Sequence, residues 1–135
     1  MLFKLINIKD YMVTRDIQLK NIETETIEIC FDDSALVGIE NFEFMKIGNL
    51  YDCKIMLFGD VVTEKIERAV KCDIINENIK IGNRLLVEVL VGKDIYYVTK
   101  KYLKKNSQEK FFLFRVSRKD LIQVDNIIHA DFKEK

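Results

Sequence analysis

The sequence predicts a mainly β protein that folds as one small β-barrel or sandwich, with at most one or two short helices. The main observation is a repeated tetrapeptide: Lys46-Ile47-Gly48-Asn49 recurs as Lys80-Ile81-Gly82-Asn83, and each copy precedes a run that ends at a glycine. Glycine and asparagine tolerate the positive φ angle of a tight connection, so both copies indicate the start of a long strand. Proline and Ser/Gly-rich linkers are absent from the 135 residues, which predicts a single domain over 1–135.

Alternating apolar and polar side chains mark the individual strands. The clearest segment is 24–31, where Ile27, Ile29 and Phe31 share one face and Thr26 and Glu28 share the other. The same pattern predicts strands at 2–8, 16–20, 24–31, 51–58, 66–75, 84–92, 95–99 and 111–116.

The two units that follow the tetrapeptides should supply the core strands. In the first unit, one face carries Tyr51, Cys53, Ile55 and Leu57. In the second unit, we expect the inward face to hold Leu85, Val87, Val89 and Val91.

Turn-forming residues divide the second half of the chain. Gly92-Lys93-Asp94 predicts a tight hairpin into 95–99, and Asn76-Glu77-Asn78 predicts a turn. Residues 104–110 form a polar run that predicts an exposed loop.

Three segments are compatible with more than one structure. Residues 35–41 suit a loop or a short helical turn, and a helix at 63–70 competes with the strand at 66–75. A capping box at Ser117-Arg118-Lys119-Asp120 would open a helix over 118–128, although a turn into a strand fits equally well.

Residues 51–116 contain about five strands with short connections, which suits a meander closed into a small barrel. The strand count, the leading glycine turn and the basic hairpin resemble the OB-type (oligonucleotide/oligosaccharide-binding) barrels of bacterial proteins. Such a barrel has a helix between its third and fourth strands, and Gly92-Lys93-Asp94 leaves no room for one. A different small barrel or a split sandwich therefore remains an alternative, with the N-terminal strands completing or covering it.

The overall charge predicts no general attraction to nucleic acid or membrane. The formal net charge is +0, but residues 1–67 carry 7 − 13 = −6 and residues 68–135 carry 15 − 9 = +6. The start of the chain lacks a signal-peptide core, and no apolar run is long enough for a membrane span. Together with an Ile- and Lys-rich composition, this predicts a bacterial, cytoplasmic protein without a membrane partner.

The sequence favours a protein that is not an enzyme and that has no cofactor or metal site. Cys30, Cys53 and Cys72 lie in apolar runs without a C-x-x-C pair, so we expect buried thiols in a reducing compartment. A pairing of Cys53 or Cys72 with His129, the single histidine of the sequence, would require an open, electropositive setting. We expect Asp32-Asp33 to cap a loop.

The one segment that suggests a ligand is basic and aromatic. Residues 93–119 hold nine Lys or Arg against two acids, giving 9 − 2 = +7, and six aromatic residues lie between them. Cations that meet phosphates beside rings that stack on bases are typical of single-stranded nucleic-acid binding. The residues expected to make such contacts are Tyr96, Lys100, Lys101, Tyr102, Lys104, Lys105, Phe112 and Arg115.

Two functions follow from these observations. The first is a non-enzymatic interaction module that binds another protein or a second copy of itself through an exposed strand edge or apolar patch. The alternative is a single-stranded nucleic-acid-binding protein that uses the segment 93–119. Exposure of Tyr96 and Tyr102 on a basic concave face would favour the nucleic-acid function.

Overall fold

The computed structural model describes residues 1–64, 66–103 and 108–133, and these are mainly strands. The strands are β1 (Leu2–Asp10), β2 (Arg15–Asn21), β3 (Ile27–Asp32), β4 (Leu50–Val62), β5 (Ala69–Ile81), β6 (Arg84–Val91), β7 (Asp94–Thr99), β8 (Phe111–Val124) and β9 (Ile127–Ile128). The helical elements are α1 (Ser34–Val37) and the 3-10 helices η1 (Phe42–Phe44), η2 (Lys100–Tyr102) and η3 (Ala130–Phe132). The predicted mainly β class is thereby confirmed. Within the described residues, none of the helices has the length and apolar character needed to cross a bilayer.

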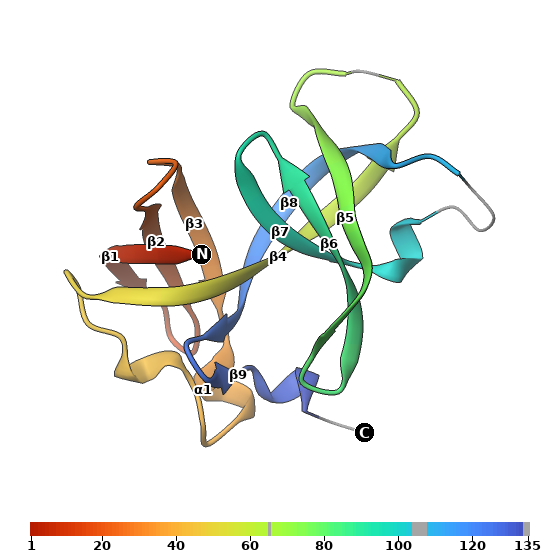
Figure 1. Cartoon of the computed structure of the whole chain (residues 1–135). Helices are drawn as coiled ribbons and strands as arrows, with labels where there is room; N and C mark the ends of the chain where they lie inside the picture. Colours follow the sequence, from red (N-terminus) through yellow and green to blue (C-terminus); the bar gives the residue numbers. More distant parts are fainter. Residues whose placement is uncertain (65, 104–107, 134–135) are drawn as a thin grey trace.

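The strands of the described residues form one sheet that closes into two rings. The sheet order is β3-β2-β1-β4-β7-β6-β5-β8-β9, with additional β3–β8 and β4–β8 pairings. The first ring contains β1, β2, β3, β8 and β4, and the second ring contains β4, β7, β6, β5 and β8. Figure 1 shows β1–β3 on one side and β5–β7 on the other, with β4 and β8 running across both.

The shared pair β4–β8 holds the two rings together. Its antiparallel register runs from Cys53↔Val124 to Val62↔Leu113, with shifts between Lys54 and Ile55 and between Phe58 and Gly59. Bulges of this kind bend and twist a strand pair. This bending allows each of the long strands β4 and β8 to contribute one half of its length to each ring. The rings close through single parallel pairs, Phe31↔Asp120 and Met56↔Tyr97.

Apolar side chains pack on both faces of the shared strands. The main core extends from the first ring to the second and includes Leu5, Ile17, Ile55, Val89 and Phe114. The predicted inward face of β4 is confirmed, since all four of its residues belong to this core: Tyr51, Cys53, Ile55 and Leu57. A smaller cluster on the other face packs η3 against the sheet; its members are Met56, Ile81, Leu86, Tyr97, Ile122 and Phe132.

Strand β3 buries the face opposite to the one that its apolar pattern predicts. Ile27 and Ile29 are exposed, whereas Glu28, Cys30 and Asp32 are buried. Each buried carboxylate meets a cation from another strand, Lys119 on β8 for Glu28 and Arg15 on β2 for Asp32. These ion pairs compensate the charges on the inner face.

The second unit also departs from its predicted pattern. Leu85 is exposed although it was expected to face the core, while Leu86 is buried in the smaller cluster. The predicted turn at Asn76-Glu77-Asn78 is wrong, because β5 continues through these residues with register shifts against β6 on both sides of Asn76. The irregularity is a bulged stretch within a strand, which accounts for the turn-like composition.

At two positions the sequence is compatible with either a helix or a strand, and the described residues of 63–70 and 118–128 are not helical. A turn at residues 67–68 leads into β5, with Arg68 at a φ of 70°. Residues 118–124 continue β8, because Leu121 and Ile122 point to opposite cores, which only an extended chain allows. The strand alternatives at these two positions are therefore the ones observed.

The two tetrapeptides adopt different connections. Gly82 has a φ of 59° and forms with Asn83 the two-residue loop of the β5–β6 hairpin, as predicted. Gly48 also has a positive φ, of 93°, but it joins η1 to β4, and its amide donates to the carbonyl of Leu5. The repeat thus reflects a shared need for a left-handed backbone rather than two copies of one hairpin. The hairpin predicted at Gly92-Lys93-Asp94 joins β6 and β7.

Candidate functional site

The described residues of the predicted nucleic-acid site lie on three elements of the second ring. Tyr96 lies on β7, Lys100, Lys101 and Tyr102 form η2, and Phe112 and Arg115 lie on β8. Lys104 and Lys105 lie outside the described residues. Strand β7 ends at Thr99 and η2 begins at Lys100, so Tyr96 and Tyr102 do not share the face of one strand.

Tyr96 belongs to the core. Its residue is 4% exposed, and the Lys119 ammonium lies 5.2 Å from the centre of its ring. Burial raises the pKa of the Tyr96 phenol, as does the hydrogen bond with Glu28. With its ring covered and its hydroxyl engaged, Tyr96 offers no surface on which a base could stack.

Tyr102 and Phe112 meet in one pocket at the end of the second ring. The pocket has a volume of about 280 Å³ and is lined by residues of β4, β5, η2 and β8. Both aromatic side chains pack edge-on against the buried Phe114. The centroid of the Phe114 ring lies 4.8 Å from that of Tyr102 and 5.8 Å from that of Phe112. The charged side chains among its described lining residues are Glu77 and Glu109. We call this the ring-end pocket.

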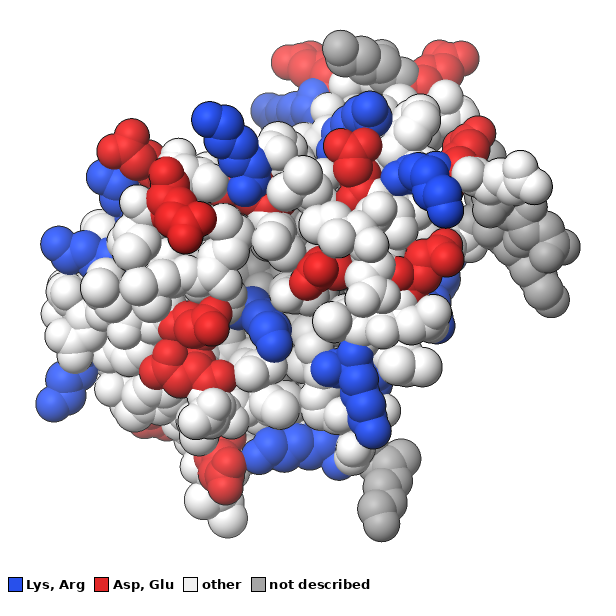
Figure 2. Space-filling view, in the orientation of Figure 1, with Lys and Arg blue, Asp and Glu red and all other residues white. Residues whose placement is uncertain are grey.

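The basic residues nearby are distributed over separate ion pairs and hydrogen bonds. Arg115 pairs with Asp60 at 3.2 Å, and Lys100 donates to the side-chain oxygen of Asn78. Arg118 makes two hydrogen bonds to Asp120, at 2.6 and 2.9 Å. On the face drawn in Figure 2, acidic and basic side chains alternate without a continuous band of one sign.

A second concave surface lies at the far end of the first ring. It is a groove of about 370 Å³ between the β1–β2 hairpin loop on one side and α1 and η1 on the other. Tyr11, Met12 and Val13 form one wall and are exposed, Met12 completely at 100%. Leu36 of α1 is an exposed residue of the other wall. We call this the tip groove.

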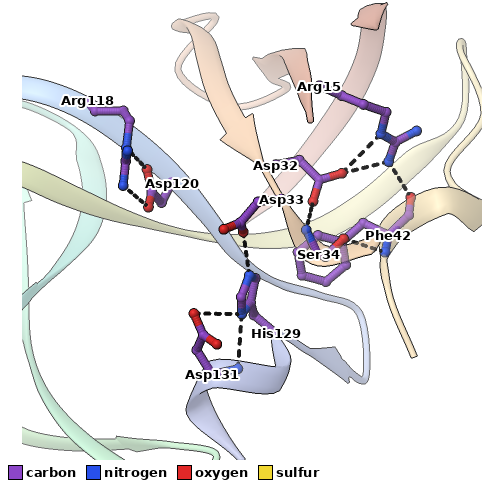
Figure 3. A network of polar contacts seen from close by, with 9 residues as sticks. All are labelled: Arg15, Asp32, Asp33, Ser34, Phe42, Arg118, Asp120, His129 and Asp131. Atoms are coloured by element: carbon purple, nitrogen blue, oxygen red, sulfur yellow. Dashed lines mark hydrogen bonds and ion pairs between the residues drawn. The ribbon is translucent and has the colours of Figure 1, made fainter. Parts of the chain in front are cut away.

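A network of buried polar contacts holds the two walls of the tip groove in place (Figure 3). The Arg15 guanidinium donates to Asp32 at 2.7 Å and to the carbonyl oxygen of Phe42 at 2.9 Å. Asp32 in turn accepts from the Ser34 amide at 2.9 Å, and the Ser34 hydroxyl accepts from the Phe42 amide at 3.0 Å. These bonds connect β2, β3, α1 and η1, so the base of the groove is preformed. Asp32 therefore caps the loop as its sequence position predicts.

His129 fixes the C-terminal segment to the same corner. The amide of Asp131 donates to Nδ1 at 3.1 Å, so this nitrogen carries the lone pair, and Nε2 lies 2.6 Å from the Asp33 carboxylate as a donor. Both ring nitrogens are thereby engaged in connecting η3 to the start of α1. His129 thus connects the C-terminal segment to a part of the chain that is distant in the sequence.

The three thiols are placed away from reactive settings. Burial raises the pKa values of Cys53 and Cys72 to about 12, and it also raises the pKa of Cys30 well above its ordinary value. A buried thiol that stays protonated is a poor nucleophile. The described residues contain no group of three or more His, Cys, Asp or Glu side chains that could hold a metal ion.

Sequence reasoning missed the tip groove. The signal was present in the segment between the first two predicted strands, where Tyr11-Met12-Val13 puts three apolar residues in a position that usually carries turn residues. Apolar side chains at the tip of a hairpin cannot reach the core and stay exposed to solvent, so they indicate a contact surface. Recognising Leu36 as its neighbour required the tertiary structure.

The fold defines a class, a mainly β protein whose one sheet forms two barrel-like rings, and the surface adds two concave sites to it. The chain matches no protein-family model, no curated protein sequence and no solved structure. Function must therefore be argued from these two sites.

Proposed function

We propose that the protein is a non-enzymatic protein-binding module that engages its partner through the tip groove. The observation that carries this proposal is the exposure of Tyr11, Met12 and Val13 beside Leu36 around one concavity. Large apolar side chains gathered at a concave site are typical of interaction surfaces, whereas scattered ones are normal on any protein.

The groove suits a protein partner because it presents exposed apolar side chains on a backbone that hydrogen bonds hold in place. The tip side chains are free of the core, yet the hairpin backbone is closed by a hydrogen bond from the Tyr11 amide to the Thr14 carbonyl at 2.8 Å. The Tyr11 hydroxyl also donates to Asp16 at 3.1 Å. A preformed surface loses little conformational entropy on binding, and this favours affinity.

The charge of the groove indicates the character of the partner. Asp10 and Glu43 line it, and Arg15, the one cation among its described lining residues, is engaged by Asp32. A partner with an apolar anchor and flanking Lys or Arg side chains would complement this surface. The same acidic rim disfavours phosphate groups.

We further propose that the OB-type resemblance belongs to the first ring. Five strands close this ring, and α1 with η1 lies between its third and fourth strands along the chain, β3 and β4. In OB-type barrels, the loop between the first two strands contributes to the binding of oligonucleotides and oligosaccharides. Here that loop is the hairpin tip, which adds a fold-level argument for binding at the tip groove.

Replacing Met12 with glutamate should weaken partner binding about 30-fold while leaving the fold intact. A charge at the centre of an apolar contact costs on the order of 2 kcal/mol or more, which corresponds to about a 30-fold loss of affinity. The measurement is affinity capture with the wild-type and M12E proteins as baits, with quantitative mass spectrometry, and sedimentation velocity of each pure protein to detect self-association.

Leu85→Glu is the matched control, because Leu85 is an exposed apolar residue of the second ring. We expect L85E to keep the partner, or the self-associated state, that M12E loses, and all three proteins to show similar thermal unfolding. Equal recovery by wild type and M12E, together with unchanged sedimentation, would contradict the proposal.

Single-stranded nucleic-acid binding is the second candidate function. It is favoured by the meeting of Tyr102 and Phe112 in the ring-end pocket, with the exposed Lys100 and Lys101 on the adjoining η2. It ranks second because the pocket itself is lined by Glu77 and Glu109.

The nucleic-acid function predicts salt-sensitive binding of a mixed-sequence oligonucleotide. Changing Lys100 and Lys101 together to glutamate should weaken that binding at least tenfold at low salt, because phosphate contacts dominate such affinities. Fluorescence anisotropy measures the effect, and Lys20→Glu serves as a control on the first ring. Absence of binding to the wild-type protein at low salt would remove this candidate.

A further inference from the structure

The outer face of β3 carries a stripe of apolar side chains. Ile27 and Ile29 are 47% and 60% exposed, and the half-buried Phe31 follows them at the same two-residue spacing. Arg118 of β8 borders the stripe, with its guanidinium 4.6 Å from the centre of the Phe31 ring, and its charge is compensated by Asp120. Single exposed apolar residues are normal on any protein, whereas contiguous ones indicate a contact surface.

The direction in which β3 faces makes this exposure informative. A shift of the strand by one residue would bury the apolar stripe and bring Glu28 and Asp32 to solvent. The structure keeps both carboxylates inside instead, where each one needs a cation from another strand. Buried ion pairs contribute little net stability compared with apolar side chains in the same place. The core of the monomer therefore does not explain why the isoleucines lie outside.

The neighbouring strand β2 adds a charge pattern that is complementary to itself. The outer-face residues of the two strands pair as Asp16↔Phe31, Gln18↔Ile29 and Lys20↔Ile27. The acid and the base thus lie two residues to either side of Gln18. A two-fold axis that lies against this face and crosses the strands at Gln18 would place Lys20 of one copy on Asp16 of the other. The same axis places Ile29 on Ile29 and Ile27 on Phe31, so apolar and charged contacts match together.

The charges of the next strand lie outside this contact. Lys4 and Lys9 of β1 are paired with Lys20 and Asp16, one strand further from the stripe. Two sheets packed face to face cross at about 30° because each is twisted, so their corners diverge. The two lysines on β1 therefore stay in solvent, and the charges that meet are those of β2.

From these observations we infer that the outer face of β3 and β2 binds a second copy of this chain in a symmetric, face-to-face dimer. The six residues of β3 span about 20 Å, and β3, β2 and β1 together are about 10 Å wide. A face of this size is small for a permanent dimer, so the association is weak and reversible. Ile27 and Ile29 are not among the described residues that line the tip groove, so the inference is independent of the proposed protein-binding function.

The first test is sedimentation velocity of the full-length protein over a series from low micromolar to millimolar concentration. We expect the average sedimentation coefficient of the wild type to rise toward that of a dimer. Ile29→Glu should weaken this association about tenfold or more, because it places two like charges on the axis. Leu85→Glu, at a position 52% exposed on the second ring, is the matched control and should associate like the wild type. A wild type that stays monomeric throughout, or an I29E protein that associates equally well, would overturn the inference.

The second test is charge reversal, which addresses the two-fold arrangement itself. Lys20→Asp and Asp16→Lys each put like charges across the axis, so each should weaken the dimer about three- to tenfold. An equimolar mixture of K20D and D16K puts opposite charges across both contacts and should associate about as tightly as the wild type. A mixture that associates no more tightly than either variant alone would contradict the proposed symmetry.

The variant M12E separates this interface from the tip groove. We expect M12E to dimerise like the wild type, and I29E to retain the partner that M12E loses. Dimerisation lost in M12E and kept in I29E would assign self-association to the tip groove. Capture of a different protein that depends on Ile29, from a wild type that stays monomeric, would assign the β3 face to that protein. Either result would overturn the inference.

Discussion

Replacing Gly59 with alanine should destabilise the protein by about 3 kcal/mol, a large effect for one methyl group. A Cβ at this position would lie 1.9 Å from the carbonyl oxygen of Arg115 and 3.0 Å from Cε2 of Phe114. The first of these atoms belongs to the backbone of β8, so a side-chain rotation cannot relieve the clash. Chemical denaturation followed by circular dichroism measures the loss as a lower midpoint.

The position of Gly59 explains the size of this effect. It follows the second register shift between β4 and β8, where the two shared strands approach closely. Separating them there would disturb both rings. Gly48→Ala is the control, since its added Cβ meets nothing within 4 Å and only the positive φ of 93° is strained. That strain amounts to about 1–2 kcal/mol. If G59A were no less stable than G48A, close packing of β4 on β8 would not be the reason for the glycine.

Replacing Lys119 with methionine should cost about 3–5 kcal/mol, because it leaves a buried carboxylate without its cation. Glu28 is 1% exposed, and its carboxylate is in contact with the Lys119 ammonium. Methionine retains most of the aliphatic stem, so the change tests the charge more than the packing. The free energy of unfolding from urea titrations gives the magnitude.

Two further variants separate the ion pair from general effects of losing a cation. Arg115→Met breaks a pair in which both side chains are more than half exposed, so a loss below about 1 kcal/mol is expected. The double variant Glu28→Gln with Lys119→Met should recover part of the K119M loss, because the uncompensated charge is gone. Equal losses for K119M and R115M would show that the pair at Glu28 contributes no more than a surface one.

The strand positions were largely predictable because their signals are local. Alternation marks 2–8, 51–58 and 95–99, and the hairpin at Gly92-Lys93-Asp94 lies where the turn residues place it. Local signals left one segment undecided, since residues 118–128 are compatible with a helix or with a turn into a strand. Residues 118–124 form the end of a strand because Leu121 and Ile122 pack in two different cores, and no local pattern contains that information.

The candidate sites were less predictable than the strands. The grouping of Tyr102 with Phe112 depends on the contact between η2 and the start of β8, and no spacing in the sequence encodes that contact. The sequence predicts Tyr96 on an accessible surface, but its side chain lies on the face of β7 that packs in the main core. The tip groove depends on the approach of two loops, with Arg15 and Asp32 as the link between them.

The sequence by itself determined a mainly β chain and the hairpins at Gly82-Asn83 and Gly92-Lys93-Asp94, because these follow from residues that are neighbours along the chain. The tertiary structure alone decided which face of β3 is buried. Apolar periodicity favours Ile27 and Ile29, but Glu28 finds its cation 91 residues away at Lys119. It also decided that β4 and β8 serve two rings, since bulges and pairings between distant strands set that arrangement. Long-range partners therefore govern both the burial of charge and the surfaces left for binding.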